Sequence, residues 1–215
     1  MAKQRKGSPP GISRRSVLKG LGGGVLTTGL ISVAELPRQQ TNVRRENGVE
    51  VYGPDAVPLT LKINGREHHL QLEPRVTLLN ALRNHLDLTG PKLVCDRGTC
   101  GGCTVLLDGM PITSCMMLAI DAVGHEIQTI EGLAQGEMLH PVQQAFIERD
   151  ALQCGFCTSG MIMSAKALLD RNPNPTLDEV KAAVSGNLCR CGTYPKVFEA
   201  VLAAAKSSGR ARKGG

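Results

Sequence analysis

Residues 95–115 have the sequence CDRGTCGGCTVLLDGMPITSC, and the spacing of its four cysteines decides how this part of the chain folds. Cys95, Cys100 and Cys103 follow one another as C-x4-C-x2-C, and Cys115 comes after a short apolar run and an Asp-Gly turn. Four cysteines at these intervals indicate a framework of cysteines that act together, rather than separate thiols scattered through the core.

A C-x4-C-x2-C segment with a distant fourth cysteine is the pattern of a plant-type [2Fe–2S] site. Three thiolates have to wrap one side of a flat cluster while backbone N–H groups point at its sulfides, which a loop can do and a helix cannot. Gly98, Gly101 and Gly102 allow this tight path because glycine accepts unusual backbone angles. We therefore expect a glycine-rich loop over 90–103 that holds a first cluster.

A second quartet consists of Cys154, Cys157, Cys189 and Cys191. The first two directly precede a predicted helix over 158–171, whose N-terminus can stabilise the negative charge of a thiolate cluster. The other two lie between later helices. We expect the paired cysteines to meet in loops at the ends of a helical bundle and to enclose a second site.

Two other uses of eight cysteines have to be weighed. Disulfides form in exported proteins, and zinc sites of four thiolates stabilise small binding modules that only recognise a partner. The x4 gap in the first quartet and the C-x-C pair in the second fit the two C-x2-C segments of a zinc knuckle poorly. Glycine-rich loops are also poorly suited to disulfide bonds that cross-link a fold. The iron–sulfur interpretation is therefore favoured over a zinc- or disulfide-stabilised binding module.

The first 36 residues are expected to be a signal peptide. Residues 13–19, SRRSVLK, resemble the twin-arginine signal, with valine where phenylalanine is usual. The apolar run over 21–34 is too short and too rich in glycine and threonine for stable membrane insertion. The sequence thus predicts export to the periplasm by the twin-arginine route, followed by a polar linker over 37–58.

The formal net charge of +6 does not indicate nucleic-acid binding. Residues 1–47 carry nine Lys or Arg and two Asp or Glu, whereas residues 48–215 carry sixteen and seventeen. Because the basic residues are concentrated near the ends, no basic stripe is left to follow a phosphate backbone.

The periodicity predicts an α+β unit over 59–132, a helical unit over 133–206 and a basic tail over 207–215. In the first unit, strands over 59–63 and 68–72 flank Asn64-Gly65, the strongest short hairpin signal, and Thr77 precedes a helix over 78–86. A further strand covers 104–107. The helices expected in the second unit cover 141–149, 158–171, 176–185 and 195–206.

Five segments together resemble the iron–sulfur subunit of molybdenum hydroxylases, the xanthine dehydrogenase/aldehyde oxidoreductase family. They are CDRGTCGGCTVLLDG (95–109), IEGLA (130–134), HPVQQAFI (140–147), QCGFCTSGMI (153–162) and SGNLCRCGTY (185–194). The resemblance covers roughly 59–205. The small subunits of periplasmic aldehyde oxidoreductases are most similar, and those of isoquinoline oxidoreductases are also similar.

The resemblance implies a β-grasp ferredoxin-like domain followed by a four-helix bundle. Cys95, Cys100, Cys103 and Cys115 would bind the cluster far from molybdenum, and Cys154, Cys157, Cys189 and Cys191 the cluster near it. Gln153 matches the glutamine that hydrogen-bonds the molybdopterin edge. Ser159 and Gly192-Thr193 depart from the commoner motifs CTPG and CRCTGY.

The resemblance also implies the function. A large partner subunit would hold molybdopterin cytosine dinucleotide and oxidise an aldehyde or, in the alternative, hydroxylate an N-heterocycle. Electrons would pass through the two clusters to FAD in a third subunit or to another acceptor. No nucleophile–base pair stands out in this chain, so no catalytic residue is expected here.

Overall fold

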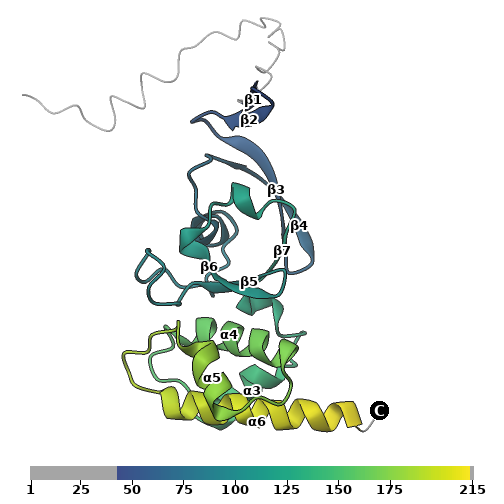
Figure 1. The fold of residues 1–215 in the computed structure, drawn as a ribbon, viewed down its shortest axis with the longest axis vertical. Coiled ribbons are helices and arrows are strands. Elements are labelled where there is room, and N and C mark those ends of the chain that lie inside the picture. Colours follow the sequence, from purple (N-terminus) through teal and green to yellow (C-terminus); the bar gives the residue numbers. More distant parts are fainter. Residues whose placement is uncertain (1–42, 214–215) are drawn as a thin grey trace, which may run out of the picture. The chain divides into compact units, whose positions relative to one another are not determined.

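The predicted hairpin over 59–72 is present in the computed structural model, which describes residues 43–213 (Figure 1). Strand β3 (Val57–Ile63) alternates buried and exposed positions and pairs antiparallel with β4 (Arg66–Leu72). Asn64 and Gly65 both have positive φ, 51° and 76°, as a two-residue type I′ turn requires. The period-two pattern therefore placed the strand and its turn correctly.

The hairpin belongs to a five-stranded sheet with the order β4-β3-β7-β5-β6. Strand β7 (Glu126–Gln128) runs parallel to β3 and antiparallel to β5 (Thr104–Leu107), which pairs antiparallel with β6 (Met110–Thr113). This mixed sheet confirms the predicted α+β, β-grasp architecture. Because β5 and β6 bracket the Asp108-Gly109 turn, the sheet brings Cys115 back beside Cys103.

A short helix supplies the apolar layer that packs on this sheet. Helix α2 (Leu78–Asn80) continues as a π-helical turn, η1 (Ala81–His85). Thr77 caps it, because its hydroxyl accepts a hydrogen bond from the Asn80 N–H at 3.2 Å. The core of this half is aliphatic and consists of Val57, Leu59, Leu61, Ile63, Leu72, Leu78, Ala81, Leu82, Val105, Ala119, Ala122 and Ile127.

Short 3-10 turns connect the sheet to the helical half. They are η2 (Ser114–Met116), η3 (Ile120–Ala122) and η4 (Ile130–Gly132). At the start of η4, buried Thr129 donates its backbone N–H to Asn64 Oδ1 at 2.9 Å and accepts from Asn64 Nδ2 at 3.0 Å. This reciprocal pair fixes the hairpin turn against the segment that leads into the helices. The domain boundary near 133 stays a prediction.

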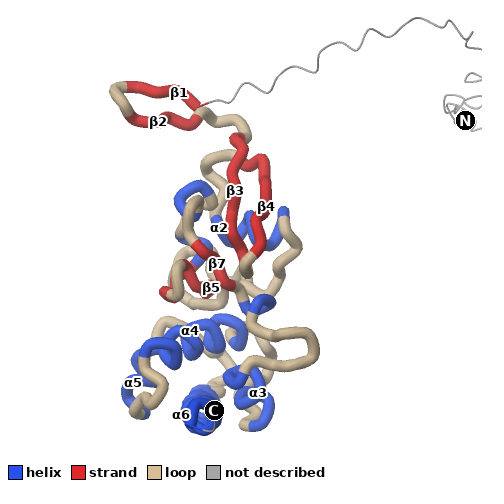
Figure 2. The backbone as a smooth tube through the Cα atoms, turned by 90° about the vertical axis from the view of Figure 1, so that its right-hand side faces the viewer, coloured by secondary structure: helices blue, strands red, loops and turns tan. Residues whose placement is uncertain are grey.

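The second half is the predicted four-helix bundle. Its helices are α3 (Pro141–Glu148), α4 (Thr158–Arg171), α5 (Leu177–Val184) and α6 (Tyr194–Lys213). Helix α4 lies between strand β5 and the other helices (Figure 2). Its residues 159–165 are all buried because both of its faces are covered. The two halves therefore share α4 as a common layer.

Two features differ from the expectation. The predicted linker over 37–58 contains a hairpin of β1 (Val43–Glu46) and β2 (Val49–Tyr52), turned at Asn47-Gly48. An Asn-Gly pair between alternating valines carries the same signal as residues 64–65, but the surrounding charges concealed it. Helix α6 extends beyond residue 206 into the predicted basic tail, although Ser207, Ser208 and Gly209 are weak helix formers.

The predicted twin-arginine segment lies outside the described residues. Among the helices that the structure does describe, none combines the length and the apolar character needed to cross a membrane.

Candidate iron–sulfur sites

The first quartet forms two thiol pairs. The Cys95 side chain neighbours that of Cys100, and the Cys103 side chain neighbours that of Cys115. Cys103 and Cys115 are buried, whereas Cys95 and Cys100 are partly exposed. The backbone N–H of Gly98 donates to Cys115 Sγ at 3.2 Å, as expected of a loop whose N–H groups face the sulfur atoms. The structure thus brings together all four predicted residues.

Hydrogen bonds to backbone carbonyl oxygens hold the loop that carries these cysteines. The Arg83 guanidinium donates to the carbonyl oxygens of Thr89 and Pro91, both at 2.8 Å. Farther along, the Lys92 N–H donates to the Gly102 carbonyl at 2.8 Å and closes the loop on itself. The loop is therefore anchored to the helix before it and to its own far end.

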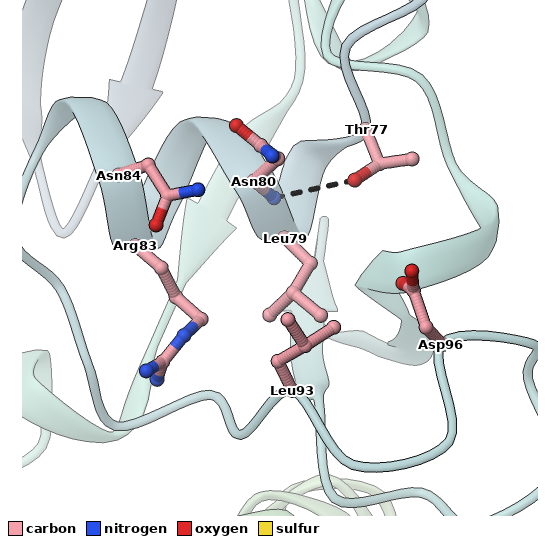
Figure 3. Close-up of a pocket in the computed structure, with 7 residues that line it drawn as sticks. All are labelled: Thr77, Leu79, Asn80, Arg83, Asn84, Leu93 and Asp96. Carbon is pink, nitrogen blue, oxygen red and sulfur yellow. Dashed lines mark hydrogen bonds between the residues drawn. The ribbon is translucent and has the colours of Figure 1, made fainter. Parts of the chain in front are cut away.

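Figure 3 shows how the base of this loop meets the helix. Leu79 from α2 and Leu93 from the loop point toward one another, and the capping bond from Asn80 to Thr77 lies beside them. These side chains and Asp96 surround a small pocket of about 60 Å³.

Two glycines of the same loop have left-handed backbone conformations. Gly98 and Gly101 adopt positive φ, 72° and 67°, which explains why the loop needs glycine there.

The second quartet also forms two pairs. The Cys154 side chain neighbours that of Cys191, and the Cys157 side chain neighbours that of Cys189. Cys157 directly precedes α4, and Cys154 lies three residues before it. Their partners, Cys189 and Cys191, lie in the loop between α5 and α6. Cys154 and Cys191 are exposed, while Cys157 and Cys189 are partly buried. One face of this site is therefore open at the protein surface.

The thiols of the first quartet ionise unequally. Hydrogen bonds from the Thr99 hydroxyl and the Arg97 backbone N–H lower the pKa of the Cys95 thiol to about 6. Burial raises the pKa of the Cys115 thiol to about 11, although the Gly98 N–H opposes this shift. A metal supplies the positive charge that lets buried thiols ionise together.

The second quartet shows the same contrast. Burial and the neighbouring Cys189 raise the pKa of the Cys157 thiol to about 12. Burial also acts to raise the pKa of Cys189, but hydrogen bonds from the side chain and backbone of Thr193 outweigh it and lower that pKa to about 7. The Cys157/Cys189 pair thus combines an easily ionised thiol with a buried one that needs a nearby positive charge to ionise.

The arrangement in pairs bears on which metal centre fits. No three or more His, Cys, Asp or Glu side chains of residues 43–213 form a group suited to a single metal ion. A [2Fe–2S] cluster has two iron atoms, and each takes two ligands from the protein. Two thiol pairs per quartet fit that requirement.

Two buried hydroxyl groups lie beside the second quartet. The hydroxyls of Thr158 and Ser159, next to Cys157, have no hydrogen-bond partner among the described residues.

A hydrogen-bonded contact joins the two sites. The backbone N–H of Leu188, next to Cys189, donates to the carbonyl oxygen of Cys100 at 2.9 Å. The side chain of buried Asn187 donates to the Gly101 carbonyl at 2.9 Å and accepts from the Ser164 hydroxyl at 2.7 Å. The two cysteine loops are therefore locked together.

Beside this contact lies a largely apolar hollow of about 270 Å³. It is lined by Val94, Cys100, Gly102, Cys154, Phe156, Cys157, Leu188 and Arg190. Both quartets thus contribute cysteines to a single surface depression.

Neither Asn187 nor the hydroxyl of Thr193 carries a local sequence signal of function. Asn187 contacts Gly101, which lies 86 positions away in the chain, so only the fold reveals the pair. Gly192-Thr193 differs from the commoner motif CRCTGY, and this difference alone predicts no role for the hydroxyl. Gln153 is exposed beside Cys154, and its role toward molybdopterin stays a prediction.

Fold and sites together define a chain with two [2Fe–2S] domains. Residues 61–127 match the 2Fe-2S iron-sulfur cluster binding domain family, and residues 129–202 match the [2Fe-2S] binding domain family. These two ranges correspond to the sheet-containing half and the helical half.

Curated relatives extend this assignment. The chain is 45% identical over 167 residues to the aldehyde oxidoreductase iron-sulfur-binding subunit PaoA of Escherichia coli O157:H7, covering 71% of this chain and 73% of that one. It is 49% identical over 148 residues to the nicotine 6-hydroxylase small subunit of Paenarthrobacter nicotinovorans, covering 69% and 89%.

Solved structures agree. Quinoline 2-oxidoreductase from Pseudomonas putida 86 superimposes with a TM-score of 0.70 at 45% identity, over 73% of this chain and 98% of that chain. The aldehyde oxidoreductase from Desulfovibrio desulfuricans gives 0.68 at 39% identity, over 71% of this chain but only 17% of that much longer one. The chain belongs to the family of iron–sulfur small subunits of molybdenum hydroxylases and is an electron-transfer subunit of an oxidoreductase.

Proposed function

We propose that the chain passes electrons from a molybdopterin cytosine dinucleotide centre in a large partner subunit to FAD in another subunit, or to a different acceptor. The cluster near molybdenum is held by Cys154, Cys157, Cys189 and Cys191, and the far cluster by Cys95, Cys100, Cys103 and Cys115. The observation that carries this proposal is the arrangement of each quartet as two thiol pairs. Bound clusters supply one-electron transfer, and the protein sets their positions and potentials.

The exposure of the two sites supports the order of transfer. Cys154 and Cys191 are exposed, and Gln153 is exposed next to them, so this face is available to a partner that holds a cofactor. We assign Gln153 to hydrogen bonding with the molybdopterin edge. In the purified complex, Gln153→Ala should slow reduction of the near cluster by substrate while iron content and both reduced-cluster spectra remain. An unchanged rate of cluster reduction would remove Gln153 from the proposal.

Aldehyde oxidation is the proposed reaction of the complex. Support comes from the E. coli aldehyde oxidoreductase subunit and from the expected export signal. An N-heterocycle hydroxylase is the second candidate, supported by the nicotine and quinoline enzymes. The purified complex should reduce an artificial electron acceptor with aldehydes, and not with quinoline, isoquinoline or nicotinate. Turnover of the heterocycles alone would favour the second candidate.

Export by the twin-arginine route to the periplasm is also proposed, and partners without signals of their own would leave the cytoplasm docked to this subunit. Arg14-Arg15 is the feature that supports it. Replacing both arginines by lysine should strand this chain and the large subunit in the cytoplasmic fraction. If the large subunit still reached the periplasm, co-export would be wrong.

A further inference from the structure

The hydroxyl of Thr193 contacts one cysteine sulfur of the second site. Thr193 Oγ1 lies 3.2 Å from Cys189 Sγ, within hydrogen-bonding distance for sulfur. Thr193 directly precedes α6, and its carbonyl accepts the Val197 N–H at 3.0 Å in the first turn of that helix. The backbone on both sides of the contact is therefore fixed, by the helix on one side and by the loop contact of Leu188 on the other.

We propose that the Thr193 hydroxyl sets the reduction potential of the cluster held by Cys154, Cys157, Cys189 and Cys191 by donating a hydrogen bond to Cys189 Sγ. The inference rests on the proposed ligation of that cluster. A cysteine bound to iron is a thiolate and has no proton to donate, so the hydroxyl is the donor. The residue acts through Cys189 and is a positioning residue rather than a catalytic one.

The other groups around Cys189 leave this role to Thr193. The backbone N–H of Cys189 is engaged by the Tyr194 hydroxyl at 2.9 Å, and that hydroxyl in turn donates to the Asn187 carbonyl at 3.2 Å. Backbone N–H groups of Thr193 and Cys191 also donate to the sulfur, but no side-chain substitution removes them. The Thr193 hydroxyl is thus the donor that a single substitution can take away without changing the backbone.

The direction of the effect follows from charge. Reduction adds one electron to the cluster, and a donor to its thiolate sulfur stabilises the more negative state more strongly. Removing the hydroxyl should therefore make the cluster harder to reduce. We expect the one-electron equilibrium constant to fall by between about threefold and tenfold, and a tenfold change corresponds to a shift of about 59 mV toward negative potential.

The competing account is that Thr193 only caps α6. A cap affects the stability of the helix and leaves the potential of a bound cluster unchanged. Thr193→Val keeps the shape of the side chain and removes the hydroxyl, whereas Thr193→Ser keeps a hydroxyl at the same position. Potential and thermal stability therefore separate the two accounts.

The test is an EPR-monitored redox titration of the complete complex with wild-type, Thr193→Val or Thr193→Ser chain. We expect a negative shift for the near cluster in the valine variant, a potential near wild type in the serine variant, and an unchanged far cluster as internal reference. Thr193→Ala replaces valine if that variant does not fold. Two intact clusters with unshifted potentials, or equal shifts in the valine and serine variants, would overturn the inference. Absence of iron from the wild-type chain would instead overturn the proposed function.

Discussion

The backbone N–H of Leu188 lies 2.9 Å from the carbonyl oxygen of Cys100 and donates a hydrogen bond to it. One end of this bond is a cysteine of the first quartet, and the other end immediately precedes Cys189 of the second. The two candidate cluster sites therefore lie in loops that contact each other directly, although the loops come from different halves of the chain. A fixed separation between redox centres is what an electron-transfer subunit requires.

Asn187 should hold this contact together. Its buried side chain bonds to the Gly101 carbonyl, to Thr104 Oγ1 at 3.2 Å and to the Ser164 hydroxyl. Asn187→Ala leaves the buried Ser164 hydroxyl without its partner and removes the bond to Gly101, whose carbonyl still accepts from Thr104 Oγ1 at 2.7 Å. The loss should cost about 1–3 kcal/mol and lower the thermal midpoint by roughly 3–10 °C. Circular dichroism of the cluster-loaded protein measures the change. Asn84→Ala, at an exposed position, is the control and should leave the midpoint within about a degree.

Gly160, in the first turn of α4, should tolerate no side chain. A Cβ atom there would lie 2.2 Å from the Gly101 carbonyl oxygen, so Gly160→Ala has to push the helix away from the first cysteine loop. We expect a large loss of stability, because backbone that is held on both sides cannot move aside cheaply. Gly186→Ala is the matched control, since nothing lies within 4 Å of its added Cβ. Equal thermal midpoints for the two variants would show that α4 and the first cysteine loop are not tightly packed at Gly160.

Removing one buried cysteine should remove one cluster. Cys115→Ala deletes a proposed ligand of the first site, so iron should fall from roughly four to roughly two atoms per chain and one EPR signal should disappear. Met116→Leu, next to it in sequence and exposed, should keep all the iron. Full iron content in the cysteine variant would exclude Cys115 as a ligand.

His140 should make the bundle sensitive to acid. Its Nδ1 accepts the Val142 N–H at 3.3 Å and caps α3, and burial and nearby Lys166 lower its pKa, with Asp170 opposing them. The folded state thus binds fewer protons than the unfolded state, so this contribution is present above about pH 6.5 and is lost as pH falls through the lowered folded pKa. His140→Asn retains a capping acceptor that does not titrate.

The measurement is the thermal midpoint of wild type and His140→Asn between pH 7.5 and pH 5, a range of about 2.5 units around the ordinary histidine pKa. The wild-type protein should lose more stability than the variant over this interval. Parallel curves for the two proteins would mean that protonation of His140 does not affect folding.

Local sequence signals predicted most of the fold. Asn64-Gly65 fixed a turn, Thr77 and Thr176 fixed the starts of helices, and the cysteine spacings identified both quartets. These signals act over a few residues, so they can be recognised without the structure. The hairpin at 43–52 carried the same Asn-Gly signal and was missed because charged side chains surround it.

The remaining features depend on contacts between distant segments. The division of each quartet into pairs places Cys154 with Cys191 and Cys157 with Cys189, an arrangement that the fold determines rather than the spacing. The bond from Asn187 to Gly101 spans 86 positions and has no local signature. Sequence patterns identify the groups that can bind a cluster, and the fold determines which of them meet.

The most direct test of the central claim is the iron and acid-labile sulfide content of the anaerobically purified chain, with an EPR spectrum after reduction by dithionite. Two [2Fe–2S] clusters predict roughly four iron and four sulfide per chain and two distinct S = 1/2 signals. Stoichiometric zinc, or a colourless and EPR-silent protein without iron, would contradict the account and leave a structural module in its place.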